Sequence, residues 1–275
     1  MVATDKVFTG AIPDIYDRLM VPMIFEPYAR DLAERVAELK PHRVLEIAAG
    51  TGVLTRAMAS RLNAETRIVA SDLNQPMLDL ARSRQHEDSR IVWQQADALG
   101  LPFEPQMFDV VACQFGVMFF PDKVQGYKEA YRVLKPGGYY LFNVWDRLAT
   151  SDFTQVVTTA LEEMFPDDPP RFMARTPHGY WDQNVIRDEL SAAGFASITI
   201  ETVDQTSRAN SARDAATAFC QGTPLRNEIE TRSPSGLEAA TERAAQALVQ
   251  RFGSGVIEGR MRAHMVTAGR EPFML

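Results

Sequence analysis

Residues 44–52 constrain the fold of this chain more than any other stretch. Residues 44–47 form a short apolar run broken only by Glu46, and residues 48–52 are small, with glycine at positions 50 and 52. Apolar residues at helical spacing follow from 53 to 62. A buried strand that leads through a turn of small residues into a helix is how an α/β sheet receives a nucleotide-like ligand, because small residues let the ligand approach the backbone. We therefore predict such a sheet, with a ligand at this turn.

Strand and helix patterns alternate through the first half of the chain. Helical spacing is expected over 25–39, and a proline at 41 ends that helix before the first strand. Four or five strand-then-helix units in succession imply a parallel, doubly wound sheet with right-handed crossovers. Proline and glycine at 135–138 are expected to end the helix before the fifth strand. The predicted strands are 43–47, 67–70, 91–95, 108–113 and 139–145.

The pattern changes after Trp145. We expect helices near 153–165 and 185–193, a sixth strand over 195–203, two or three helices within 212–251, and a last strand over 259–268. The stretch at about 205–257 is interpreted as a helical insertion that caps the sheet. The prediction is a single domain over 1–275, with an N-terminal helical lid (1–40), a cofactor-binding core (41–146) and a substrate side (147–275).

Composition excludes several classes of protein. The net charge is −7 and no Lys/Arg-rich stripe occurs, which disfavours nucleic-acid binding. The first ten residues lack the apolar core of a signal peptide, and no apolar run approaches the ~18 residues of a membrane span. Cys113 and Cys220 are expected to be buried, reduced thiols of a cytoplasmic protein. No metal site and no oligomeric state are predicted.

Carboxylates follow three of the predicted strands. Glu46 lies at the end of the first strand, Asp72 at the end of the second and Asp97 after the third. Asp72 lies 20 residues after Gly52, a spacing at which an acid can accept hydrogen bonds from the hydroxyls of an unphosphorylated ribose. The alternative is that these residues only cap helices. Three acids in register favour a ligand.

The ordered motifs LEIAAGTG (45–52), SD (71–72), QADAL (95–99), FDVV (108–111) and RVLKPGG (132–138) resemble those of class I S-adenosylmethionine-dependent methyltransferases. The most similar branch contains the ubiquinone/menaquinone-biosynthesis methyltransferases. The resemblance implies a Rossmann-like, seven-stranded sheet whose last strand runs antiparallel beside the sixth. Ala48 departs from the motif, which has glycine there, and we expect the backbone to tolerate it by keeping φ negative.

The resemblance also implies a cofactor site. Glu46 would favour the cationic amino group and sulfonium, while Ala48, Gly50 and Gly52 would leave room for the methionine part. Asp72 would hold the ribose. The remaining implied residues are Leu73 and Met77 beside the adenine, Asp97 and Ala98 at its exocyclic amine, Gln114 at the methionine end, and Tyr16 and Arg30 as residues that could close over the cofactor. Tyr16 could equally be a core aromatic.

The acceptor decides whether a base is needed. A neutral amine attacks directly, whereas a hydroxyl or carbon acid must lose a proton to a positioned side chain. His178, in the loop after the fifth strand, is the candidate base, the alternative being a histidine that only contacts backbone. Aromatic residues favour a small apolar or aromatic acceptor reacting through oxygen, nitrogen or carbon, unless they are simply core. These are Phe115, Phe119, Trp145, Tyr180 and Trp181.

Two other functions remain open. A nicotinamide-dependent oxidoreductase also uses strand-one glycines and an acid after strand two, but this turn lacks G-x-G-x-x-G. A regulatory protein would bind the cofactor without turnover. The favoured prediction is methyl transfer from S-adenosyl-L-methionine to a small molecule, which releases S-adenosyl-L-homocysteine.

Overall fold

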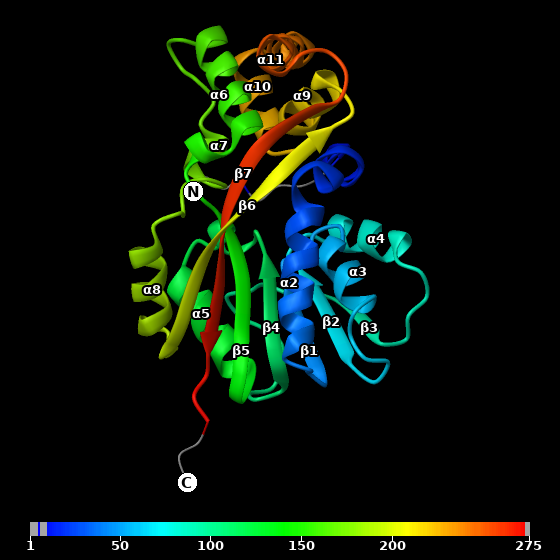
Figure 1. Ribbon diagram of the computed structural model, residues 1–275, viewed down its shortest axis with the longest axis vertical. Coiled ribbons are helices and arrows are strands. Elements are labelled where there is room, and N and C mark those ends of the chain that lie inside the picture. The colour runs from blue at the N-terminus through cyan, green and yellow to red at the C-terminus, as the bar shows by residue number, and fades with distance from the viewer. Residues whose placement is uncertain (1–4, 6–9, 273–275) are drawn as a thin grey trace. The chain divides into compact units, whose positions relative to one another are not determined.

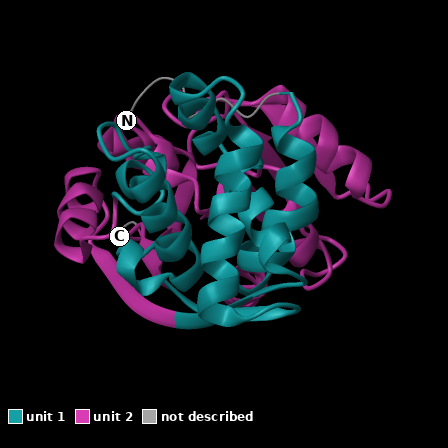
Figure 2. Ribbon diagram, turned by 90° about the horizontal axis from the view of Figure 1, so that it is seen from above, with its two compact units in different colours: residues 1–27, 145–179, 204–262 teal, residues 28–144, 180–203, 263–275 magenta. Residues whose placement is uncertain are grey.

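A computed structural model describes residue 5 and residues 10–272 of the chain (Figure 1). The chain divides into two compact units (Figure 2). Unit 1 comprises the described residues up to Pro27, with Trp145–Gly179 and Asp204–Arg262. Unit 2 comprises Tyr28–Val144, Tyr180–Val203 and the described residues from Ala263 onward. Part of the predicted N-terminal lid, at 1–4 and 6–9, lies outside the described residues.

Seven strands form one sheet in the order β3-β2-β1-β4-β5-β7-β6. β1 pairs in parallel with β2 and β4, β2 with β3, and β4 with β5. The predicted fold class, a mostly parallel sheet with an antiparallel last strand, is confirmed. The strands are β1 (Arg43–Ile47), β2 (Arg67–Asp72), β3 (Ile91–Gln95), β4 (Phe108–Gln114), β5 (Leu134–Trp145), β6 (Ser197–Ala209) and β7 (Ile257–Gly269).

The direction of β7 follows from its pairing with β5. The amide of Arg270 donates to the carbonyl of Gly138 near the start of β5, and Asp146, just past its end, donates to Arg262. Residue numbers fall along one strand as they rise along the other, so the two strands are antiparallel. The residues of β6 and β7 are divided between the two units.

The helices of unit 2 begin and end where local chemistry predicts. Asp122 and Asp182 cap α5 and α8 by accepting hydrogen bonds from the amides of Gln125 and Asn184. Pro76 lies in the first turn of α4, where its missing N–H costs nothing. The helices are α3 (Val53–Ala59), α4 (Gln75–Arg84), α5 (Lys123–Val133), α8 (Gln183–Ala192), the 3₁₀ turn η3 (Val117–Phe119), and α2 (Glu26–Glu38), whose first two residues belong to unit 1.

Unit 1 is mostly helical. Breaks at Pro224 and at Ser233 divide the predicted helical stretch at 212–251 into three helices, α9, α10 and α11. α11 packs against α9 and α6. The elements are α1 (Ile12–Ile15), the π-helix η2 (Tyr16–Phe25), the 3₁₀ turn η4 (Leu148–Thr150), α6 (Asp152–Met164), α7 (Phe172–Arg175), α9 (Ala212–Gln221), α10 (Leu225–Arg232) and α11 (Leu237–Phe252).

The start of β5 corrects one expectation. Residues 135–138 were expected to be a turn, but β5 begins at Leu134 and includes them. Gly137 adopts φ +81°, which its lack of Cβ permits, and its amide donates to the carbonyl of Arg270. A β carbon at Gly138 would lie 2.8 Å from the carbonyl oxygen of Asp109. Pairing with the chain after β7 therefore overrides the local preference of these residues for a turn.

Candidate functional site

The turn after β1 has three residues in left-handed conformation. Ala48 has φ +56°, Gly50 φ +56° and Gly52 φ +82°. The expectation that Ala48 keeps φ negative is therefore wrong. A left-handed alanine costs roughly 1–2 kcal/mol relative to its preferred conformation. Space for its methyl group comes from Gly116, where a β carbon would lie 2.6 Å from the Cβ of Ala48.

Asp72 holds this turn against the end of β2. One carboxylate oxygen accepts a hydrogen bond from the amide of Gly50 and the other from the amide of Asn74, each at 2.8 Å. The side chain is buried, and its desolvation raises the pKa of the carboxyl, while the amides of Asn74 and Gly50 oppose this. Each oxygen has two lone pairs, so further donors such as ribose hydroxyls can still bind.

Glu46 lies under the same turn with 1% of its surface exposed. Its Oε2 accepts a hydrogen bond from Thr55 Oγ1 at 2.5 Å. Burial raises the pKa of this carboxyl to about 8, against the lowering effects of Thr55 and Arg56. The Arg56 guanidinium donates to the carbonyl of Thr51 at 2.6 Å. A buried acid of this kind favours an incoming cation, because the cation would stabilise its charged form.

The residues predicted beside the adenine follow β2 and β3, and they differ in exposure. Leu73 is exposed, whereas Met77 is buried, with its Cε 3.8 Å from where a β carbon at Gly50 would lie. Asp97 is exposed, and its Oδ1 accepts a hydrogen bond from the amide of Leu99 at 2.9 Å. Ala98 is buried. The apolar side chain of Met77 suits the face of an adenine ring, and the exposed carboxylate of Asp97 suits its exocyclic amine.

Trp93, on β3, was missed by the sequence analysis. It is partly buried and packs against Ala49, Ala70 and Leu78. Its Cη2 lies 3.2 Å from where a β carbon at Gly52 would lie. The sequence offered one signal for it: Trp93 is an aromatic residue on β3, the neighbour of the strand that ends at Asp72. In the sheet, Trp93 lies opposite Ala70 of β2.

The end of β4 is strained and anchored by a second residue that sequence reasoning missed. Phe115 has φ +48°, and its amide donates to Oδ1 of the fully buried Asn143 at 2.8 Å. Its ring meets Tyr28 edge-on with centroids 5.4 Å apart. Gln114, at the last position of β4, is buried. Asn143, a polar residue in the apolar run of β5, was the signal, because a buried amide needs a partner.

Four other predicted residues also belong to unit 2. Tyr180 is buried, donates a hydrogen bond to Glu189 of α8 and lies 3.0 Å, oxygen to oxygen, from Tyr127 of α5. Its burial raises the pKa of the phenol. Phe119 and Trp181 are partly buried, and Arg30 lies on the exposed side of α2.

Unit 1 brings together four aromatic rings, three of which were predicted site residues. The ring centroids of Tyr16 and Phe25 are 5.2 Å apart, those of Phe25 and Trp145 are 6.0 Å apart, and those of Trp145 and His178 are 5.9 Å apart. Tyr16 and Phe25 are the two ends of the π-helix η2. Ten residues of π-helix are unusual, and such segments often occur at functional sites.

His178 is the polar member of this cluster. It is buried, and its Nδ1 lies 2.8 Å from the carbonyl oxygen of Asp146. Desolvation lowers the pKa of the ring to about 4, although the Asp146 carbonyl opposes this. The ring is therefore neutral at pH 7. Because a carbonyl only accepts, Nδ1 carries the proton and Nε2 is the nitrogen that can take one up.

The strand order, the reversed β7 and the glycine turn after β1 define the class of the protein, which has the Rossmann-like fold of the class I methyltransferases. Phosphoethanolamine N-methyltransferase 2 from Haemonchus contortus, solved with S-adenosyl-L-methionine, shares the fold with a TM-score of 0.63 at 17% identity. The match covers 99% of this chain and 61% of that chain.

The chain belongs to the ubiE/COQ5 methyltransferase family, whose model matches residues 5–204. It is 29% identical over 173 residues to the ubiquinone/menaquinone biosynthesis C-methyltransferase UbiE of Idiomarina loihiensis, over 58% of this chain and 69% of the relative. It is 30% identical over 172 residues to the demethylmenaquinone methyltransferase of Clavibacter sepedonicus, over 59% and 69%. The protein is therefore an S-adenosylmethionine-dependent methyltransferase, as predicted, and neither alternative function is favoured.

Proposed function

We propose that this enzyme methylates a ring carbon of a small quinone-type molecule in its reduced, hydroxylated form. The names of the relatives, which refer to ubiquinone, menaquinone and demethylmenaquinone, support this substrate class. The observation that carries the proposal is the neutral, buried imidazole of His178 within an aromatic cluster. Aromatic walls suit a flat, apolar ring. The contact of Nδ1 with the Asp146 carbonyl leaves Nε2 as the atom of the His178 ring that can accept a phenolic proton.

The cofactor assignments are also proposals. Asp72 would accept hydrogen bonds from the ribose, Leu73 and Met77 would flank the adenine, and Asp97 with Ala98 would meet its exocyclic amine. Left-handed backbone at Gly50 and Gly52 and a buried acid at Glu46 are the features of the described chain that fit the methionine part. Ala48, Gln114, Tyr16 and Arg30 complete the proposed set.

The chemistry needs one proton acceptor. When bound, S-adenosylmethionine supplies an electrophilic methyl group. His178 Nε2 would take the proton of the acceptor's hydroxyl, which raises electron density on the ring carbon beside it. That carbon would form the new C–CH₃ bond as the S–CH₃ bond breaks. The ring C–H proton would pass to the phenolic oxygen, which restores the aromatic, hydroxylated ring, and the proton held by His178 would leave to solvent. Holding the partners in a near-attack arrangement supplies much of the rate.

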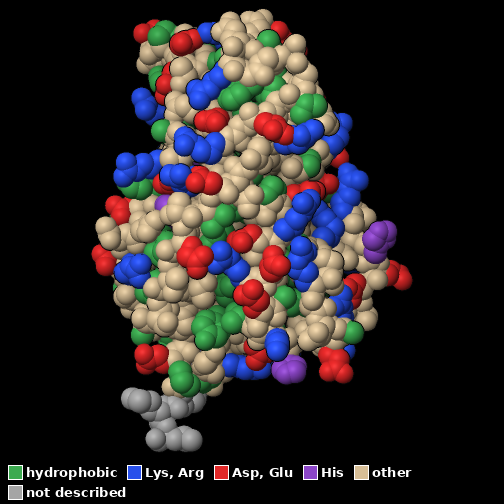
Figure 3. Space-filling model, viewed as in Figure 1, with side chains coloured by type: hydrophobic (Ala, Val, Ile, Leu, Met, Phe, Trp, Pro, Cys, Tyr) green, Lys and Arg blue, Asp and Glu red, His purple; other side chains and the backbone are tan. Residues whose placement is uncertain are grey.

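Three further predictions, on the domain, the acceptor pocket and the cellular location, are also proposals. We propose that the chain is one methyltransferase domain with a helical insertion at about 205–257, that Phe115, Phe119, Trp145, Tyr180 and Trp181 line the acceptor pocket, and that the enzyme is cytoplasmic. No helix within residues 10–272 is long and apolar enough to cross a membrane. Cationic and anionic side chains are interspersed on the face shown in Figure 3, which supports a small-molecule substrate over a nucleic acid.

A panel of reduced quinones, phenols and amines, read by release of S-adenosylhomocysteine, tests the substrate class. With a hydroquinone acceptor, we expect His178→Ala to lower kcat by about 10²–10⁴-fold, the usual contribution of a general base. His86→Ala, at an exposed histidine, is the matched control and should leave kcat unchanged. Turnover with amines alone, or full activity of His178→Ala, would refute the proposal.

A further inference from the structure

Asp5 is a buried carboxylate of unit 1 that binds a segment distant in sequence. Its Oδ1 accepts a hydrogen bond from Arg175 Nη2 at 2.6 Å. Its Oδ2 accepts from Arg175 Nε at 3.1 Å and from Thr176 Oγ1 at 2.6 Å. The arginine thus uses two nitrogens on the two carboxylate oxygens, a geometry that gives direction as well as strength. Asp5, with 1% of its surface exposed, therefore fixes two consecutive residues at the end of α7.

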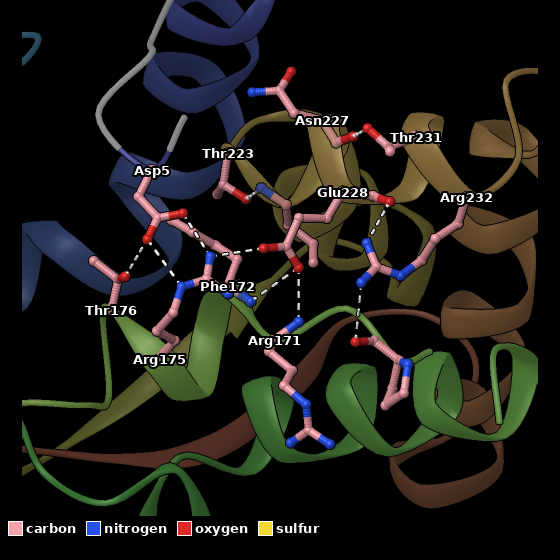
Figure 4. A network of polar contacts seen from close by, with 12 residues as sticks. Asp5, Arg171, Phe172, Arg175, Thr176, Thr223, Asn227, Glu228, Thr231 and Arg232 are labelled. Carbon is pink, nitrogen blue, oxygen red and sulfur yellow. Dashed lines mark hydrogen bonds and ion pairs between the residues drawn. The ribbon is translucent and has the colours of Figure 1, made fainter. Parts of the chain in front are cut away.

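Glu228 of α10 holds the same segment from the other side (Figure 4). Its Oε1 accepts a hydrogen bond from Arg175 Nη2 at 2.7 Å. Its Oε2 accepts from the amides of Arg171 at 2.7 Å and Phe172 at 3.2 Å, where α7 begins. The Arg175 guanidinium lies between two carboxylates, which raise its pKa. α7 is held at both ends by acidic side chains from other parts of unit 1.

The chain between Arg175 and His178 is tightly wound. The amide of Thr176 donates to the carbonyl of Phe172, and that of His178 donates to the carbonyl of Met173, both at 2.9 Å. At Gly179 a β carbon would lie 2.1 Å from the carbonyl oxygen of Arg175. No other residue type fits there without moving the backbone. A displacement of Arg175 or Thr176 therefore displaces the turn that carries His178.

We propose that Asp5 is a positioning residue, which fixes the His178 ring on the Asp146 carbonyl by holding Arg175 and Thr176. This inference rests on the proposed role of His178 as the base. Without the Asp5 carboxylate, the Arg175 guanidinium and the buried Thr176 hydroxyl lose a charged hydrogen-bond acceptor. Because an unpaired buried polar group is costly, these side chains move to find other partners. The Nδ1 contact that sets the tautomer of His178 then loses its fixed geometry.

The test compares three variants in the full chain. Asp5→Ala removes the carboxylate, and Asp5→Glu retains it on a longer side chain. Arg213→Gln is the matched control, because Arg213 of α9 pairs with Glu238 and Glu242 of α11 and belongs to a different ion-pair cluster of unit 1. The readouts are the ¹⁵N resonances of the His178 ring in histidine-labelled protein, amide hydrogen exchange of residues 173–178, and kcat with KM.

We expect Asp5→Ala to broaden or shift the His178 ring signals and to speed amide exchange at 173–178 at least tenfold. The fold decrease in kcat should be about ten times the fold increase in KM. Asp5→Glu should recover part of the exchange protection and part of the loss in kcat. Arg213→Gln should leave the His178 signals, the exchange rates and kcat unchanged. Unchanged His178 signals in Asp5→Ala would overturn the inference, even if activity falls. If Asp5→Ala does not fold, Asp5→Asn gives the same comparison.

A failure of the proposed function has a different signature. His178→Ala would then retain full activity, while the ring signals of His178 would still respond to Asp5→Ala. The spectroscopic result therefore tests the positioning role alone, and the kinetic result of His178→Ala tests the base.

Discussion

At the scale of single residues, the left-handed backbone of Ala48 depends on the absence of a side chain at Gly116. Ala48 follows β1 and Gly116 follows β4, so the space at Gly116 links the turn after β1 to the end of β4. A β carbon at Gly116 would lie 2.6 Å from both Ala48 Cβ and Cys113 Sγ. Gly116 is required by its neighbours and not by its own dihedral angles, because its φ of −105° suits any residue.

Gly116→Ala is expected to lower the free energy of unfolding by about 1–3 kcal/mol, the usual cost of overpacking a buried site. Ala48→Gly should be neutral or stabilise by up to about 1 kcal/mol, since relief of left-handed strain is offset by glycine's flexibility. The double variant should recover part of the loss. Urea unfolding measures all three, and Gly100→Ala, with no atom within 4 Å of its new carbon, is the control. Purely additive effects would contradict a direct contact.

Glu46 gives a pH dependence of stability. Its folded pKa is about 8, raised from 4.5, so the folded state binds more protons than the unfolded state between these values. Stability therefore falls as pH rises from about 4.5 to about 8, with a slope of up to roughly 1.4 kcal/mol per pH unit from this group. Glu46→Gln should remove that part of the slope in urea unfolding from pH 5.5 to 8. The exposed Glu65→Gln should retain it. Identical slopes in wild type and Glu46→Gln would show that the carboxyl is not desolvated.

At the scale of elements, local pattern was enough for the short parallel strands β1 to β4. β1 and β3 begin and end where the sequence predicted, and β2 and β4 each continue past the predicted end. Short apolar runs between turns leave few alternatives. β5 and β6 are longer than predicted, β5 at its start and β6 at its end, because their outer residues can pair with other strands in ways that local sequence does not reveal.

In the candidate site, too, local sequence predicted some residues and missed others. The acids and glycines of the turn could be found because they follow strands at recognisable spacings. Trp93 and Asn143 had weaker signals, because their contacts are with residues distant in sequence, Ala70 of β2 for Trp93 and Phe115, just past β4, for Asn143. The π-helix η2 also has no local sequence signature, and Pro22 within it would ordinarily argue against a helix.

At the scale of the whole molecule, the family model ends at residue 204, before the three helices α9, α10 and α11. The sheet and its glycine turn are features shared with the family, whereas these helices belong to the part of the chain that follows the match. These helices and His178 belong to unit 1, whereas Asp72 and Gly50 lie in unit 2.

We propose that Asp72 and the glycine turn bind the adenosine of S-adenosylmethionine, and calorimetric titration measures this binding. We expect wild type to bind S-adenosylmethionine and not NAD, and Asp72→Ala to bind it about 10–150-fold more weakly, equivalent to the roughly 1.5–3 kcal/mol of hydrogen bonds to a charged group. Asp79→Ala, an exposed acid on α4, should bind like wild type. Equal affinity of Asp72→Ala and wild type would contradict the claim.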